Sequence, residues 1–216
     1  MSNSQVGTYK FEAFPFHLDV RGKLSMGVLG KHLLNCADAY AAERGFDVVE
    51  QGGEHYTWVL SRLAIELEDL PSCHESFSIQ TWVENVYRLF ADRNFVICNK
   101  DEKPIGYVRS VWAMISMETR NPANLLDLHG NRITNSICEK ECPIAKPGRI
   151  KVSQQEAVSE YVAKYSDLDI NGHVNSIKYI EHILDIFPLD IYKKKALKRF
   201  EIAYVAESYY GDTLSF

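Results

Sequence analysis

One eight-residue segment occurs twice in this chain, 150 positions apart, and the repeat constrains the possible folds more than any other feature. Residues 18–25 read LDVRGKLS and align without gaps on residues 168–175, which read LDINGHVN. Apolar residues at helical spacing follow each copy, and Ser25 and Asn175 stand where the N-cap of each helix is expected. The sequence therefore predicts a tandem duplication, with a long helix beginning directly after each copy of the segment.

The span after the first helix has the alternating pattern of β-strands, in four runs: Val59–Leu67, Phe77–Val83, Phe95–Ile97 and Tyr107–Met117. The connections between these runs are too short to hold a crossover helix, which parallel pairing would require. Antiparallel pairing is therefore expected. The predicted fold class is α+β, with a long helix packed on an antiparallel sheet in each copy.

The predicted domains are 1–120 for the first copy and 149–216 for the second, joined by a linker at 121–148 that is rich in Asn, Pro and charge. The second copy repeats only the beginning of the first, with a strand pattern over 152–165, a helix over 176–187 and a strand over 197–207. Counterparts of later strands are missing, so the second copy is expected to be incomplete. Either the natural chain continues beyond Phe216 or a partner chain, as in a homodimer, completes the sheet.

The two copies of the segment differ at the positions where chemistry is expected. The second copy has Asp169, Asn171 and His173, which in extended chain would point to one side, close to the free N–H groups of a helix N-terminus. The first copy has Arg21 and Lys23 at the positions of the amide and the imidazole. Only the second copy is therefore predicted to carry a catalytic site.

A calcium-binding loop is an alternative interpretation of the same residues. Asp167, Asp169 and Asn171 fit the early ligand positions of an EF-hand, but the twelfth position, which requires a bidentate Glu, is Lys178. The cysteines form no pair of pairs at zinc spacing and are expected to be buried or incidental thiols: Cys36, Cys73, Cys98, Cys138 and Cys142. No metal and no other cofactor is therefore expected.

A purely structural interpretation of the second copy also stays open, because Asp169 and Asn175 could simply satisfy N–H groups at the start of the helix. The remaining histidines lack a carboxylate and an amide at regular spacing, and they are expected to lie on the surface or to take part in ordinary packing: His17, His32, His55, His74, His129 and His182.

Composition agrees with an enzyme or binding protein that has a substantial core. The chain has 216 residues, of which 46% are hydrophobic and 25% charged, and its formal net charge is −5. The sequence contains neither an apolar run of about 18 residues nor a charged and then apolar leader. We expect no membrane span, no nucleic-acid partner and a cytoplasmic location.

Four segments, taken in order, resemble the acyl-acyl-carrier-protein thioesterases of bacteria and plant plastids: Trp58–Arg62, Thr81–Val83, Arg109–Met114 and Asp167–Asn175. The resemblance covers nearly all of the chain from Tyr9 onward, and the last segment is the specific one. It implies a double hotdog fold, in which each sheet wraps around a long helix, with the active site in the C-terminal copy. The implied reaction is hydrolysis of a fatty acyl thioester of acyl carrier protein.

The resemblance also implies a set of site residues. The catalytic Asp, Asn and His of the family fall on Asp169, Asn171 and His173, and its downstream Glu falls on Glu207. Plant members often have Cys at the next position, where this chain has Ser208, so a mechanism that requires a Cys nucleophile is not expected here.

The residues leave several roles open. A water mechanism needs a carboxylate base, which could be Glu207 or Asp169, and donors for the oxyanion, which Asn171 and the helix N-terminus could supply. His173 could position the water or act as the acid–base partner. Direct attack by Asp169 to form an acyl-enzyme is also open.

Two other functions stay open, a hotdog-fold dehydratase or hydratase and a non-catalytic acyl-binding module. The basic run Lys193–Lys195, with Lys198 and Arg199, could be an ordinary solvated loop. Alternatively, it could receive an acidic acyl carrier protein, which the net negative charge of the chain would otherwise repel.

Overall fold

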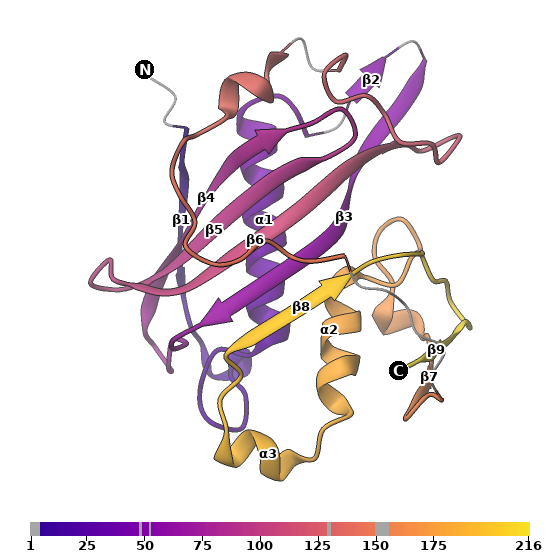
Figure 1. Ribbon diagram of the computed structural model, residues 1–216. Coiled ribbons are helices and arrows are strands. Elements are labelled where there is room, and N and C mark those ends of the chain that lie inside the picture. Colours follow the sequence, from indigo (N-terminus) through magenta and orange to yellow (C-terminus); the bar gives the residue numbers. More distant parts are fainter. Residues whose placement is uncertain (1–4, 48, 52, 129–130, 150–155) are drawn as a thin grey trace.

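The computed structural model describes the chain except for residues 1–4, 48, 52, 129–130 and 150–155. Its helices and strands follow one another as shown in Figure 1: β1 Gly7–Glu12, η1 Pro15–His17, α1 Met26–Glu43, β2 Val49–Gln51, β3 Glu54–Leu67, β4 Ser76–Val86, β5 Ala91–Asn99, β6 Pro104–Ser116, η3 Thr134–Ser136, β7 Glu160–Val162, η4 Tyr165–Asp167, α2 Ser176–Asp185, α3 Leu189–Lys194, β8 Arg199–Ala203 and β9 Thr213–Ser215.

A seven-stranded antiparallel sheet forms the centre of the molecule. Its strands lie in the order β1-β4-β5-β6-β3-β2, and β8 also pairs with β3. Strands β4, β5 and β6 follow one another as hairpins, with pairings such as Thr81 to Phe95 and Phe95 to Val108. The antiparallel arrangement predicted from the short connections is confirmed.

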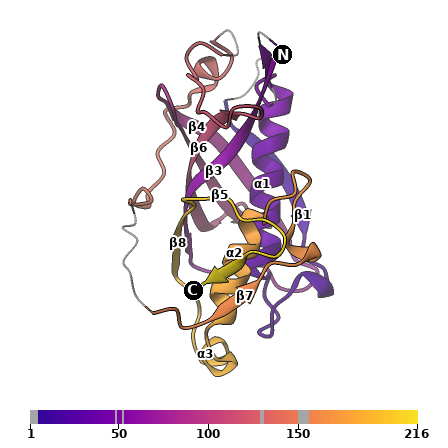
Figure 2. The same cartoon turned by 90° about the vertical axis from the view of Figure 1, so that its right-hand side faces the viewer.

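Helix α1 packs along one face of this sheet, and α2 lies on the same side (Figure 2). The predicted N-cap is confirmed, because the Ser25 hydroxyl accepts a hydrogen bond from the Val28 N–H at 3.3 Å. Buried residues of the helix meet buried residues of the strands in one core, which includes Leu29, Leu33, Ile79 and Phe95. Burial of this apolar stripe, rather than intrinsic helix propensity, holds α1 in place.

The two long helices approach closely where α1 has a glycine. A Cβ atom placed on Gly30 would lie 2.6 Å from the Cδ1 atom of Ile177 in α2, which is inside van der Waals contact. Ile177 is almost fully buried and belongs to the same core as α1. The absence of a side chain at position 30 therefore fixes how α2, and the segment that precedes it, sit against the first copy.

Strand β8 joins the second half of the chain to the first sheet. Its residues pair antiparallel with β3, from Arg62 opposite Ala203 to Glu66 opposite Arg199. The fold is α+β and a tandem hotdog, as predicted. The second half contains α2, α3, β8 and a small sheet in which β7 pairs with β9.

Several predicted boundaries differ from the structure; the strand expected over 197–207, for example, is β8 at Arg199–Ala203 only. The strand expected over 152–165 is wrong in extent, since β7 covers only Glu160–Val162, a 3-10 turn follows at Tyr165–Asp167, and residues 152–155 lie outside the described part. Neither face of the predicted strand was cleanly apolar, so little burial was available to extend it. Helix α2 ends at Asp185, two residues before the expected end, and Pro188 precedes α3.

The segment predicted as a linker packs tightly on the molecule. It crosses the face of the sheet opposite to α1 (Figure 2), where the Trp82 indole donates to the Lys140 carbonyl at 2.8 Å and Arg109 donates to the Cys142 carbonyl at 2.6 Å. Leu125 and Ile133, which belong to the segment, are almost fully buried in a core cluster with Phe46 and Met114. The division into domains 1–120 and 149–216 stays a prediction.

Candidate active site

The repeated segment forms a tight turn in the second copy, not the extended strand assumed from the sequence. Leu168 and Val174 form an antiparallel bridge, the Asp169 N–H donates to the His173 carbonyl at 2.8 Å, and the Gly172 N–H donates to the Asp169 carbonyl at 3.1 Å. Gly172 has φ of +79°, a value that glycine adopts readily. The expectation that side-chain alternation brings the polar groups together is therefore wrong; the turn itself brings them together.

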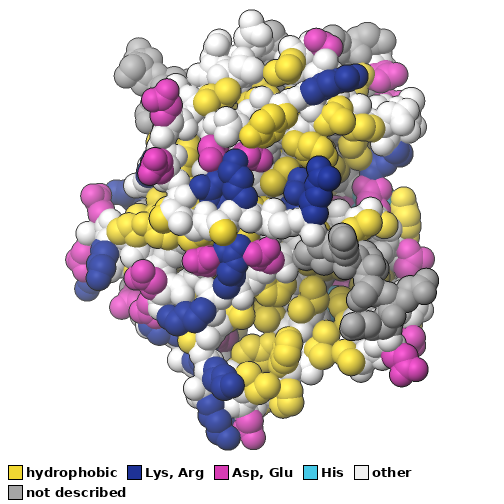
Figure 3. Space-filling view, viewed as in Figure 1, with side chains coloured by type: hydrophobic (Ala, Val, Ile, Leu, Met, Phe, Trp, Pro, Cys, Tyr) yellow, Lys and Arg dark blue, Asp and Glu magenta, His cyan; other side chains and the backbone are white. Residues whose placement is uncertain are grey.

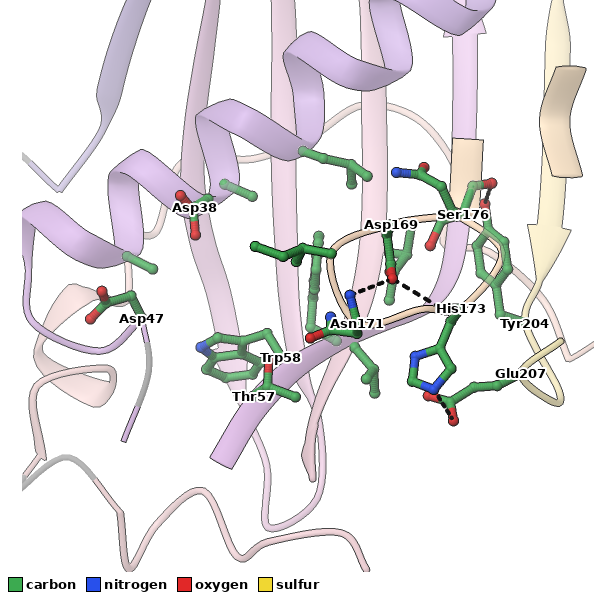
Figure 4. A pocket seen from close by; sticks show the side chains of 18 of the residues that line it. Asp38, Asp47, Thr57, Trp58, Asp169, Asn171, His173, Ser176, Tyr204 and Glu207 are labelled. Atoms are coloured by element: carbon green, nitrogen blue, oxygen red, sulfur yellow. Dashed lines mark hydrogen bonds and ion pairs between the residues drawn. The ribbon is translucent and has the colours of Figure 1, made fainter. Parts of the chain in front are cut away.

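The carboxylate of Asp169 holds this turn. Its Oδ1 atom accepts hydrogen bonds from the backbone N–H groups of Asn171 at 2.8 Å and His173 at 3.1 Å, both drawn in Figure 4. In the first copy, Asp19 accepts from the N–H groups at positions 21 and 23, at 2.8 and 3.3 Å. The two copies therefore share this local hydrogen-bond pattern, although their side chains at the next positions differ.

The side chains at positions 21 and 23 of the first copy are committed to ion pairs. Arg21 pairs with Asp19 at 2.9 Å, and Lys23 pairs with Asp69 at 2.9 Å. None of the residues 18–25 is among the described residues that line the cavity discussed below. The shared turn thus carries different side-chain chemistry in the two copies.

The turn of the second copy leads directly into α2. The Asn175 side chain accepts from the Ile177 N–H at 2.9 Å, which confirms the predicted N-cap. Ser176, the first residue of the helix, lines the cavity. The N-terminus of α2, with its partial positive charge, therefore lies at the cavity wall beside Asn171 and His173.

Glu207 approaches His173 from the segment after β8. The Glu207 Oε2 atom lies 3.6 Å from the His173 Nε2 atom, and the other carboxylate oxygen of Glu207 forms an ion pair with Arg120 (Figure 4 shows the His173 and Glu207 side chains). The ring of Tyr209 stands edge-on to the imidazole, with ring centroids 5.0 Å apart. Side-chain exposure is 17% for His173 and 35% for Glu207, so the pair lies at the boundary between protein and solvent.

A cavity of about 780 Å³ begins at this pair and extends under α1. The four site residues predicted from the sequence, Asp169, Asn171, His173 and Glu207, all line it. Figure 4 shows Asp38, Asp47, Thr57 and Trp58 toward its other end. Other lining residues come from α1 and from strands of the first copy: Leu34, Ala37, Ala41, Val59, Leu60, Val83, Ala91, Arg93 and Trp112. The cavity therefore connects polar groups of the second copy with the interior of the first.

Tyr204 fixes one wall of the cavity. Its hydroxyl donates to the Ser176 carbonyl at 2.9 Å, and its backbone N–H donates to the Ser61 carbonyl at 2.9 Å. Burial raises the pKa of Tyr204 well above its ordinary value, so the phenol stays protonated and keeps its donor. These bonds hold the start of α2 in register with β3.

A second polar cluster lies behind the turn and corrects the expectation for His182. Asp167 is almost fully buried; it accepts hydrogen bonds from the Tyr161 hydroxyl at 2.9 Å and the Lys164 N–H at 2.8 Å. The His182 Nε2 atom lies 3.3 Å from Asp167 without hydrogen-bond alignment, and its ring stacks on Tyr161. His182 is therefore paired with a carboxylate, contrary to the prediction.

Burial alone would raise the pKa of Asp167. Hydrogen bonds from the Lys164 N–H and the Tyr161 hydroxyl, together with the neighbouring His182, bring the pKa below its ordinary value instead. The backbone carbonyl of Asp167 also accepts the Asn175 N–H at 2.8 Å, so this residue supports the site turn through its backbone as well as through its side chain.

Among the described residues, no group of three or more His, Cys, Asp and Glu is arranged to hold a metal ion. The five cysteines are free; three are buried (Cys36, Cys98, Cys142), Cys138 is half-buried and Cys73 is exposed. The expectation of buried or incidental thiols is confirmed by these positions.

Sequence reasoning missed several residues around the site. Arg120 and Tyr204 reach it only through long-range packing, and no local pattern marks them. The Asp167 cluster did have a signal, because the offset of 150 places His182 opposite His32 and Tyr161 opposite Phe11. That comparison would have shown a carboxylate in the second copy where the first copy has His17.

Comparison with known proteins identifies the family. Residues 5–129 match the family model described as the acyl-ACP thioesterase N-terminal domain, and residues 150–216 match the acyl-ACP thioesterase C-terminal domain. The chain belongs to the acyl-ACP thioesterase family. This agrees with the resemblance noted in the sequence and with the tandem arrangement of the fold.

Solved structures of the acyl-ACP thioesterase family superpose closely on the chain. An acyl-ACP thioesterase from Bacteroides thetaiotaomicron is 61% identical, with a TM-score of 0.91, and the match covers 98% of this chain and 85% of that one. A 12:0-ACP thioesterase from Umbellularia californica shares the fold with a TM-score of 0.80 at 17% identity, over 97% of this chain and 80% of that one.

A palmitoyl-acyl carrier protein thioesterase from Gossypium hirsutum is 26% identical over 180 residues, which is 80% of this chain and 44% of that protein. The chain thus spans less than half the length of this curated relative of the family.

Proposed function

We propose that this protein hydrolyses the thioester that joins a fatty acyl chain to acyl carrier protein, releasing the free fatty acid. The observation that carries the proposal is the cavity of about 780 Å³ that runs from the His173–Glu207 pair into the interior of the first copy. This volume lies within the usual range for small-molecule sites. The relatives named for palmitoyl and 12:0 substrates act on thioesters of this class.

We assign the base to Glu207 and the support of the turn to Asp169. The Asp169 carboxylate makes the same two backbone hydrogen bonds as Asp19, in a copy of the segment that lies outside the cavity. Glu207 instead presents one oxygen toward His173 at the cavity mouth. A carboxylate beside an imidazole suits general-base activation of water.

In the proposed reaction, Glu207 accepts a proton from water and the water oxygen attacks the thioester carbonyl carbon. His173 orients the water, delivers a proton to the sulfur as the C–S bond breaks, and then takes the water proton from Glu207, which restores both groups. The Asn171 side chain and the N-terminus of α2 lie at the same wall and would stabilise the oxyanion. Ser208 is not among the described residues that line the cavity, which supports a reaction without a nucleophile at that position.

The direct test is to incubate the purified protein with acyl carrier proteins bearing chains of different length and to measure free fatty acid. Release of fatty acid with equal release of the carrier thiol supports hydrolysis. Formation of an enoyl thioester would instead identify the dehydratase or hydratase alternative, and binding without turnover would identify an acyl-binding module.

We further propose that the basic surface at Lys193–Lys195 receives the acidic carrier protein. These residues are exposed at the end of α3, and basic side chains gather at the lower end of the face shown in Figure 3, where α3 lies. Arg199, included in the predicted cluster, is committed to ion pairs with Glu66 and Glu201. The proposed docking surface therefore consists of the exposed lysines, of which Lys193 lies 3.8 Å from Asp190 and Lys198 donates to the Glu68 carbonyl at 3.1 Å.

Exchange of Lys193, Lys194 and Lys195 for Glu should raise KM for acyl carrier protein substrates at low salt, because rim charges act mainly on association. Hydrolysis of a small acyl pantetheine should stay near wild type. An unchanged KM for the carrier substrate at low salt would remove this surface from docking.

No described helix is both long enough and apolar enough to cross a membrane. A cytoplasmic location and a homodimer remain proposals from the sequence. Light scattering coupled to size-exclusion chromatography tests the second, and cell fractionation with an antibody to the protein tests the first.

A further inference from the structure

Arg120 reaches the candidate active site from the first copy, across 87 positions of sequence. It lies in the turn after β6, where the Arg120 N–H donates to the Ser116 carbonyl at 3.0 Å. Its guanidinium forms an ion pair with Glu207, and both residues line the cavity. The contact therefore links the first copy to the residue proposed as the base.

Glu207 is held from two sides. One carboxylate oxygen meets Arg120, and the other lies 3.6 Å from the His173 Nε2 atom. A glutamate side chain has three rotatable bonds, and at 35% exposure little packing restrains this one. The guanidinium fixes one oxygen and so limits the directions in which the other can point.

The backbone of Arg120 supports this interpretation. Its φ is +60°, in the left-handed region that residues other than glycine rarely adopt. Glycine would satisfy the turn with less strain, and at this position the residue instead carries a side chain that contacts the site. Neighbouring Glu118, in the same turn, pairs with His55 at 3.0 Å instead of with a cavity residue.

We infer that Arg120 is a positioning residue, which orients the Glu207 carboxylate toward His173 and makes the active site depend on contact between the two copies. This inference rests on the proposed hydrolase function. Arg120 acts on the reaction through Glu207 and not through the substrate. Two consequences follow: loss of Arg120 lowers kcat more than it changes KM, and the effect requires an intact Glu207.

The test uses a small acyl pantetheine, so that carrier docking does not contribute. Arg120→Gly removes the guanidinium while relaxing the left-handed backbone, which keeps the variant folded. Arg120→Lys retains a charge without the planar, two-pronged geometry. Glu118→Gln is the matched control, because it removes a charge from a pair in the same turn, and neither Glu118 nor His55 lines the cavity.

Arg120→Gly should lower kcat on the order of tenfold with KM nearly unchanged, and Arg120→Lys should recover part of the loss. In a Glu207→Gln background, Arg120→Gly should change kcat by less than about twofold, because its route of action is already removed. Glu118→Gln should match wild type.

Three results would overturn the inference. A wild-type kcat for Arg120→Gly would show that Glu207 needs no such support. A loss that persists in the Glu207→Gln background together with a raised KM would show that Arg120 contacts the substrate. Equal losses for Arg120→Gly and Glu118→Gln would show that only the turn matters. Failure of the proposed function is distinguishable, because the wild-type protein itself would then release no fatty acid.

Discussion

Replacing the two candidate carboxylates separately tests the assignment of roles at the site. Glu207→Gln removes the proposed base but keeps the size of the side chain. Loss of a general base lowers kcat by about 10²–10⁴-fold, which corresponds to roughly 3–5 kcal/mol of activation free energy. Asp169→Asn has a different expected effect, because the amide oxygen can still accept the hydrogen bonds from Asn171 and His173.

The cost of Asp169→Asn should appear mainly in stability. Two hydrogen bonds to a charged acceptor, at 2.8 and 3.1 Å, become hydrogen bonds to a neutral one. Each exchange loses roughly 1 kcal/mol or less, so the free energy of unfolding should fall by about 1–2 kcal/mol. Asp19→Asn is the control in the copy outside the cavity, where Asp19 makes the same pair of backbone bonds and, in addition, an ion pair with Arg21.

The assay measures kcat with an acyl pantetheine and the free energy of unfolding in urea for the three variants. Asp19→Asn should lose at least as much stability as Asp169→Asn, because it also breaks the ion pair with Arg21, and both variants should keep kcat within about tenfold of wild type. Glu207→Gln should lose activity without a matching loss of stability. The reasoning is refuted if Asp169→Asn loses as much kcat as Glu207→Gln, since Asp169 would then perform the chemistry itself.

Three further outcomes are expected. His173→Ala should lower kcat by about 10²-fold or more, whereas Lys23→Ala, at the matching position of the first copy, should leave kcat nearly intact in the same fatty acid assay; equal losses would misplace the site. Gly30→Ala should lower the free energy of unfolding measured in urea, because its Cβ would lie 2.6 Å from the Ile177 Cδ1 atom, and an overpacking cost of about 1–3 kcal/mol exceeds the gain of roughly 1 kcal/mol in helix propensity; a raised free energy of unfolding would contradict the close contact. Asp167 has a lowered pKa in the folded protein, so its charge stabilises the fold above the unfolded pKa of about 3.9, and this stabilisation is lost as pH falls through the folded pKa. The difference in unfolding free energy between wild type and Asp167→Asn should therefore shrink from pH 7 to pH 3. A difference that stays constant with pH would contradict this linkage.

The sequence alone predicted the elements whose causes are local. The N-caps at Ser25 and Asn175 depend on residues within a few positions, and they were predicted. The turn around Asp169 was not predicted, because the segment was interpreted as extended chain, although its hydrogen bonds are equally local and form in both copies. Antiparallel pairing followed from connections too short for a crossover. Comparison of the copies also indicated Asn171 and His173 as candidate site residues, because the second copy differs from the first at these two positions.

Only the tertiary structure decided which distant groups meet. Glu207 was placed at the site through a family resemblance, but its partner Arg120 lies 87 positions away, and nothing near either residue encodes the contact. The pairing of β8 with β3 and the packing of Ile177 against Gly30 are likewise long-range. Strand partners and helix contacts are selected by the apolar surface that the whole chain buries together, whereas a turn is selected by its own few hydrogen bonds. The cavity is likewise a product of long-range packing, because its walls come from both copies.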